Sequence, residues 1–101
     1  MNTEHIIIGL ILHSGDAKNH MHMALSYAKE KDYTSVEKEI ELAEKALNEA
    51  HTVQTEFLHA EASGNATEIT ALFVHAQDHL MTTITEMNLI KEIIELRREV
   101  K

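Results

Sequence analysis

The feature that most constrains this fold is a long apolar repeat in the C-terminal third of the chain. Its members recur at alternating spacings of four and three residues: Ile69, Phe73, Ala76, Leu80, Thr83, Met87, Ile90 and Ile94. This spacing is typical of a helix that packs along its whole length against other helices. The 101 residues contain no Pro and only three Gly, so little in the sequence would interrupt such a helix. We therefore predict a helix over residues 66–99.

Two further helices are predicted over residues 3–30 and 35–62. The first has apolar residues at helical spacing, and the second repeats the four-three alternation with Gln54 as its polar member. The connections between the helices are short, which makes consecutive helices antiparallel. The chain is thus expected to be all-α, a three-helix antiparallel bundle forming one domain over residues 1–101.

Local signals predict where these helices begin and end. Thr34 and Glu37 form a capping box that is expected to start the second helix. Gly64 is expected to end it in a left-handed conformation, and Asn65 to cap the third helix. Gly15 falls inside the first helix, where Gly costs roughly 1 kcal/mol relative to Ala. It therefore indicates either a close helix contact or a local break.

A second apolar stripe on the third helix indicates assembly. Leu89, Ile93 and Leu96 lie beside the first repeat, so the apolar face covers roughly half of the helix circumference. Each helix is roughly 40 to 50 Å long, and two slender neighbours cannot cover so wide a face. We therefore expect a homo-oligomer.

Composition excludes several classes of protein. There is no Cys, which rules out disulfides and thiolate chemistry. The formal net charge is −8, and residues 46–90 contain no Lys or Arg. Nucleic acid is therefore not an expected partner, whereas a basic protein surface is. The apolar run 6–12 is too short to span a bilayer and follows no basic segment, so a cytoplasmic location is expected.

A polar cluster interrupts the apolar pattern of the third helix. His75, Asp78, His79 and Thr82 fall on the stripe that continues as Leu89, Ile93 and Leu96, so we expect this face to be buried. Polar groups on a buried face cost free energy unless they are paired or used. Five other histidines are interpreted as structural or surface residues: His5, His13, His20, His22 and His59.

Two chemistries fit the polar cluster. In one, His75 and His79 chelate a transition metal from consecutive turns, as in a metal-dependent helical-bundle hydrolase, although no third ligand can be identified. In the other, His75 is a nucleophile that accepts a group and passes it on. A coiled-coil interaction module without chemistry is a third interpretation.

Residues 74–81, Val-His-Ala-Gln-Asp-His-Leu-Met, resemble the signature of a bacterial protein family. The family is the IIA component of the lactose/cellobiose class of the sugar phosphotransferase system. Residues 14–18 (Ser-Gly-Asp-Ala-Lys) and 50–55 (Ala-His-Thr-Val-Gln-Thr) agree with it, and the resemblance extends over nearly the whole chain. The chain departs from the usual Ala-Arg-Ser continuation at Lys18 and Asn19.

This resemblance implies a homotrimer in which three subunits form a nine-helix bundle. It implies that His75 is phosphorylated by the phosphocarrier protein HPr and passes the group to a cysteine of the cognate IIB component. It also implies that Asp78 from three chains holds one divalent cation, expected to be structural Mg²⁺, on the trimer axis. The membrane would be reached only indirectly, through the IIC transporter.

Physical arguments support these roles. Three converging carboxylates repel one another unless a hard cation neutralises them. A phosphohistidine that must release its group is poorly served by permanent cations, so the region without Lys or Arg favours a carrier over a hydrolase. Neutral donors would then stabilise the phosphoryl group, with His79 ranked ahead of Gln77. The roles of His51, Gln54, Lys18 and Asn19, and the sugar, are left open by the sequence.

Overall fold

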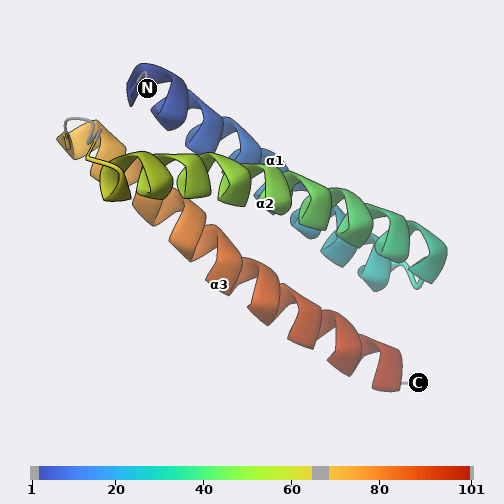
Figure 1. Ribbon diagram of the computed structural model, residues 1–101. Coiled ribbons are helices and arrows are strands. Elements are labelled where there is room, and N and C mark those ends of the chain that lie inside the picture. Colours follow the sequence, from blue (N-terminus) through green and yellow to red (C-terminus); the bar gives the residue numbers. More distant parts are fainter. Residues whose placement is uncertain (1–2, 65–68, 101) are drawn as a thin grey trace.

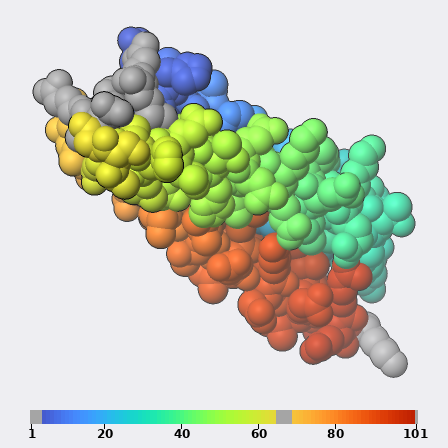
Figure 2. Space-filling model, viewed as in Figure 1, coloured from blue at the N-terminus to red at the C-terminus, as the bar shows by residue number. Residues whose placement is uncertain are grey.

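The computed structural model describes residues 3–64 and 69–100. Three helices account for nearly all of them: α1 (Thr3–Lys29), α2 (Tyr33–Ala62) and α3 (Ala71–Glu99). Helix α1 packs against both of the others, and α3 diverges from α2 toward the C-terminal end (Figure 1). The subunit is a slender rod of 55 × 20 × 18 Å, as the space-filling view also shows (Figure 2). The all-α, three-helix prediction is confirmed.

Helix α2 begins two residues before the predicted start at residue 35. Asp32 is its N-cap: one carboxylate oxygen accepts a hydrogen bond from the Ser35 backbone N–H at 3.3 Å, and the other accepts from the Ser35 hydroxyl at 2.7 Å. The capping role predicted for Thr34 is therefore wrong, because Thr34 already lies inside the helix. Asp is as good an N-cap as Thr, and it comes first in the chain.

Helix α3 begins later than the predicted residue 66. Ile69 and Thr70 are not helical, and the Thr70 hydroxyl accepts a hydrogen bond from the Phe73 backbone N–H at 3.1 Å. Thr70 is therefore the N-cap, in an extended conformation that suits this role. The predicted cap at Asn65 lies outside the described residues.

The three glycines have different roles. Gly64 follows the end of α2 with a φ of 84°, which confirms the predicted left-handed conformation. Helix α1 runs unbroken through Gly15, where a Cβ atom would meet nothing within 4 Å. Neither the close contact nor the break expected there is present. The close contact is at Gly9, where a Cβ atom would lie 3.1 Å from Val53 on α2.

The buried interior consists of two apolar clusters. The His75-end cluster comprises Ile6, Ile7, Leu10, Ala50, Phe57, Phe73, Ala76 and Leu80. The far-end cluster comprises Ala17, Met21, Ala24, Ala28, Val36, Ala43, Ala46, Met87, Ile90 and Ile94. All helical members of the predicted α3 repeat are buried, whereas Ile69 precedes the helix and is 63% exposed. The periodic pattern therefore identified the buried face of α3.

The second apolar stripe of α3 is uncovered in one subunit. Leu89, Ile93 and Leu96 are 60%, 42% and 61% exposed, because α1 packs on the other side of α3 and the two apolar clusters that include α2 residues lie there as well. Burying such side chains fully is worth about 1.5–3 kcal/mol each. A contiguous exposed apolar surface of this kind is typical of an interaction site. Within residues 3–64 and 69–100, no helix combines the length and apolar character needed to cross a membrane.

Candidate functional site

The predicted site residues lie together on the first half of α3. His75 and Asp78 are exposed, and Gln77 and His79 are partly buried. Residues three and four positions apart on a helix are neighbours, so His75, Asp78 and His79 form one surface patch. The expectation that this face is buried is wrong for the single chain, because α1 and α2 cover the opposite side. His75 is therefore accessible to another protein.

Three large apolar side chains on the same half of α3 as His75 are exposed. Leu72, Val74 and Met81 are 56%, 55% and 50% exposed. Exposed apolar side chains next to a reactive group are suited to contacts with a docking protein. The Thr82 hydroxyl, in contrast, donates to the backbone carbonyls of Asp78 and His79 at 3.0 and 3.2 Å, so it is satisfied within the helix.

Burial lowers the pKa of His79 from the usual value for histidine, and the neighbouring Lys18 and His75 lower it further. The carboxylates of Glu86 and Asp78 oppose this effect without cancelling it. His79 is therefore neutral at pH 7, with one ring nitrogen able to donate a hydrogen bond and the other able to accept one. This is the state expected of a neutral phosphoryl stabiliser.

An ionic network joins α1 to α3 on the C-terminal side of His79. His22 Nε2 lies 2.5 Å from Glu86 Oε2, and Lys18 Nζ lies 4.0 Å from Glu86 Oε1. Lys18 is the only Lys or Arg among residues 1–28 and 46–90. These three residues are not connected by any pattern in the sequence, because their proximity depends on the offset of α1 along α3. The types of these residues do not by themselves predict that they form ion pairs.

Other histidines of α1 pair with carboxylates of α2. His13 Nδ1 lies 3.0 Å from Glu49 Oε2, and His20 Nδ1 lies 2.7 Å from Glu39 Oε2. Glu39 is among the buried residues, so its partner offsets part of the cost of removing the carboxylate from water. These contacts agree with the structural role expected for His13 and His20.

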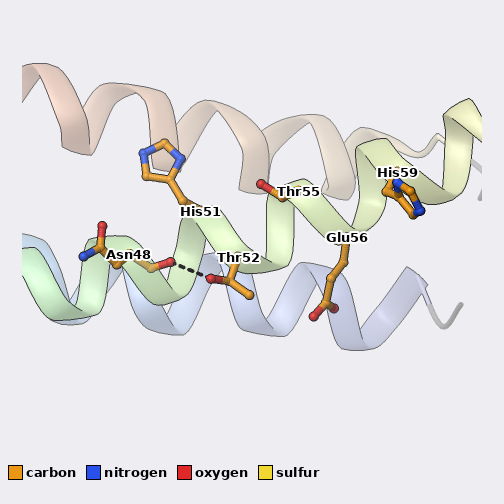
Figure 3. Close-up of a pocket in the computed structure, with 6 residues that line it drawn as sticks. All are labelled: Asn48, His51, Thr52, Thr55, Glu56 and His59. Atoms are coloured by element: carbon orange, nitrogen blue, oxygen red, sulfur yellow. Dashed lines mark hydrogen bonds between the residues drawn. The ribbon is translucent and has the colours of Figure 1, made fainter.

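His51 lines a groove of about 550 Å³ on the surface of α2. The groove is lined by Asn48, His51, Thr52, Thr55, Glu56 and His59. Figure 3 shows His51 and Thr55 pointing toward the α3 side of α2, whereas Thr52 and Glu56 point toward α1. The Thr52 hydroxyl donates to the Asn48 carbonyl at 3.0 Å. All of the lining residues belong to α2, so the groove is not part of the α3 patch that contains His75.

The described residues of one chain contain no group of three His, Asp or Glu side chains placed to hold a metal ion. His75 and His79 therefore have no third protein ligand of the kind that catalytic zinc sites use. Asp78 alone offers two carboxylate oxygens, which suit a hard cation only when further carboxylates converge on it. A magnesium site at Asp78 would thus need other copies of the chain.

Comparison with known proteins identifies the family to which the chain belongs. The model of the family described as "PTS system, Lactose/Cellobiose specific IIA subunit" matches residues 5–98. The chain belongs to this family. It is thus a IIA component of a phosphotransferase system for sugar uptake.

Individual members of the IIA family support the match over the full length. The N,N'-diacetylchitobiose-specific EIIA component of Escherichia coli (strain K12) is 39% identical over 98 residues, which cover 97% of this chain and 84% of that protein. The crystal structure of the cellobiose-specific enzyme IIA from Bacillus anthracis has a TM-score of 0.94 and 41% identity, covering 99% of this chain and 92% of that one.

A third relative is a complex. The solution structure of the Escherichia coli IIA(Chitobiose)–HPr complex has a TM-score of 0.84 and 36% identity, covering 99% of this chain and 97% of that one. The sugars named for these relatives differ, although the proteins share one fold with this chain. Membership in the IIA family therefore does not identify the sugar.

Proposed function

We propose that this chain is a cytoplasmic phosphoryl carrier in which His75 is the carrier residue. A nitrogen of the His75 imidazole attacks the phosphorus of phosphorylated HPr, and the P–N bond in HPr breaks as the new P–N bond forms. The bond to His75 then breaks as a cysteine sulfur of the cognate IIB component takes the phosphoryl group. His75 thus acts as a nucleophile that is regenerated in each cycle.

The observation that carries this proposal is the exposure of His75 on a half of α3 where Leu72, Val74 and Met81 are exposed as well. A carrier residue must be reached by two different proteins in turn, so it must lie on an open surface. The existence of an IIA–HPr complex in a relative of the same fold supports HPr as the donor.

The charged residues around His75 favour transfer of the phosphoryl group over its retention on the histidine. The nearest Lys or Arg in the sequence are Lys45 and Lys91, and the cation that the structure brings near His79 is Lys18, which also lies 4.0 Å from a Glu86 oxygen. Phosphoryl transfer depends mainly on positioning and charge stabilisation. Neutral His79, with Gln77 in second place, would hold the group without binding it tightly, and basic side chains of the docking protein would complete the site.

We further propose that the active form is a homotrimer with Mg²⁺ at Asp78. The exposed stripe of Leu89, Ile93 and Leu96 supports burial against other copies, and Asp78 lies on the same side of α3. Three carboxylates brought together on this stripe would need a hard cation, and Mg²⁺ completes its octahedral shell with water. The ion would neutralise the carboxylates and would take no part in phosphoryl transfer.

The test is phosphorylation of the full chain by HPr, Enzyme I and phosphoenolpyruvate, followed by intact mass spectrometry. The unsubstituted chain should gain one phosphoryl group, and His75→Ala should gain none. His59→Ala is the matched control, because it removes an exposed histidine from α2 and should leave the uptake unchanged. Uptake of one phosphoryl group by His75→Ala would show that the wrong residue has been assigned.

A further inference from the structure

A basic pocket of about 360 Å³ lies between the C-terminal ends of α1 and α3. Ile93 and Leu96 form part of its apolar lining, and its cations are Lys29, Lys31 and Arg97. All three cations are exposed, and none of them forms an ion pair within the part of the chain that the structure describes. A pocket lined by one sign of charge attracts groups of the opposite sign. The basic pocket is therefore suited to a carboxylate or another anion.

Two consecutive arginines at this end of α3 differ in their contacts. The Arg98 side chain forms an ion pair with Glu37 on α2, and its guanidinium carbon lies 4.6 Å from the centroid of the Tyr33 ring. Arg98 thus joins α3 to α2 within the subunit. Arg97 lines the basic pocket instead, where it can contact a group from outside the subunit.

The basic pocket borders the exposed stripe of α3. Ile93 and Leu96 line the pocket and also belong to this stripe, where they are 42% and 61% exposed. A second copy of the chain that covers the stripe therefore also reaches the pocket. The anion that fits the pocket is accordingly sought on the α3 surface of that second copy.

Glu92 lies on the other flank of the exposed stripe. At about 100° per residue, Glu92 and Arg97 are about 140° apart around α3, one on each side of the stripe. They do not face each other within one chain, since only residues three or four positions apart do so. Glu92 is exposed and forms no ion pair with any other residue that the structure describes. Glu99, which is also exposed, follows seven residues later on the same flank.

We propose that Glu92 of one copy enters the basic pocket of the next copy and pairs with Arg97 there. This inference rests on the proposed homotrimer, in which a threefold axis along α3 makes the three α3 helices parallel. Residues that flank the apolar seam of parallel helices form ion pairs between the helices, and the partners are five positions apart in sequence, as Glu92 and Arg97 are. Each subunit thus gives one carboxylate and receives another. The pairs favour the parallel orientation, which brings the three Asp78 side chains to one level.

Charge reversal in the full chain tests this pairing, with the association constant measured by sedimentation equilibrium over a dilution series. Arg97→Glu should weaken association at least about tenfold, because three ion pairs are lost at once and like charges meet in their place. Glu92→Arg should have an effect of similar size. The double variant Glu92→Arg, Arg97→Glu should return the association constant to within about threefold of that of the unsubstituted chain, because it restores all three pairs with their charges exchanged.

Glu95→Arg is the matched control, because it makes the same charge change at an exposed α3 position outside the pocket and should leave association unchanged. Urea unfolding at one chain concentration ranks the same variants if the trimer does not dissociate on dilution. An unsubstituted chain that does not sediment as a trimer would overturn both the proposed homotrimer and this pairing. A trimer that Arg97→Glu does not weaken, or that the double variant does not restore, would overturn the pairing alone.

Discussion

Helix α3 has two apolar stripes that differ in what covers them. The buried stripe, from Phe73 to Ile94, packs mainly against α1 and shares its two apolar clusters with residues of α2. The exposed stripe contains Leu89, Ile93 and Leu96, and it leads back along the helix to Asp78 and His75. One helix therefore presents two surfaces, one that holds the subunit together and one that is available to other molecules.

The difference shows how a small subunit can combine stability with function. The buried stripe consists almost wholly of apolar residues, with Thr83 as its one hydroxyl. The exposed stripe combines apolar residues with the polar residues of the signature. Its polar members cost the single chain little, because they remain in water. Substitutions on the two stripes should therefore act on different properties.

The largest effect is expected for Leu80→Ala on the buried stripe. Leu80 is fully buried in the His75-end cluster, so the substitution should lower the free energy of unfolding by about 2–5 kcal/mol. Urea unfolding at one fixed protein concentration measures this loss. Met81→Ala, at the exposed neighbour, should lower it by less than about 0.5 kcal/mol. Equal losses for the two variants would remove the distinction between the stripes.

Leu89→Asp should act on assembly instead. In a trimer it would place three carboxylates in an apolar contact without partners, so we expect monomers in sedimentation velocity. Each folded subunit should lose only about 0.5 kcal/mol from the lower helix propensity of Asp. Asn88→Asp adds the same charge at the adjacent exposed position and should leave the assembly intact. An intact trimer of Leu89→Asp would show that the exposed stripe is not the contact surface.

The smallest effect on assembly is expected for Asp78→Leu, although it lies on the same stripe. An apolar side chain can replace a neutralised carboxylate cluster without loss of stability, so the variant should still sediment as a trimer. Metal analysis should find about one Mg²⁺ per three chains in the unsubstituted protein and none in the variant. Glu95→Leu, on another side of α3, should keep the ion. A wholly monomeric Asp78→Leu protein would contradict this prediction.

The sequence predicted the helices and their buried faces well, because both depend on local periodicity. It placed the helix starts less accurately. Thr34 and Asn65 were plausible caps, but Asp32 and Thr70 hold the N-terminal backbone groups instead. Several polar residues near a helix start can accept the same hydrogen bond, and the backbone conformation selects among them.

The candidate site was predicted in part. The signature around His75 identified the family, and the family model confirms that membership. The sequence did not show that one subunit leaves His75 and Asp78 exposed, because exposure depends on which side of α3 the other helices occupy. The close contact or local break predicted at Gly15 is absent, whereas Gly9 makes the close approach to Val53.

The sequence by itself determined the three amphipathic helices and the chemistry available at His75, since periodicity and residue type are local properties. Only the tertiary structure decided how far α1 is shifted along α3. That shift brings Lys18 and His22 to Glu86, places Lys18 near enough to lower the pKa of His79, and sets Ser14 and Thr83 between the two clusters. The physical reason is that the offset between two helices depends on side chains far apart in the sequence packing together.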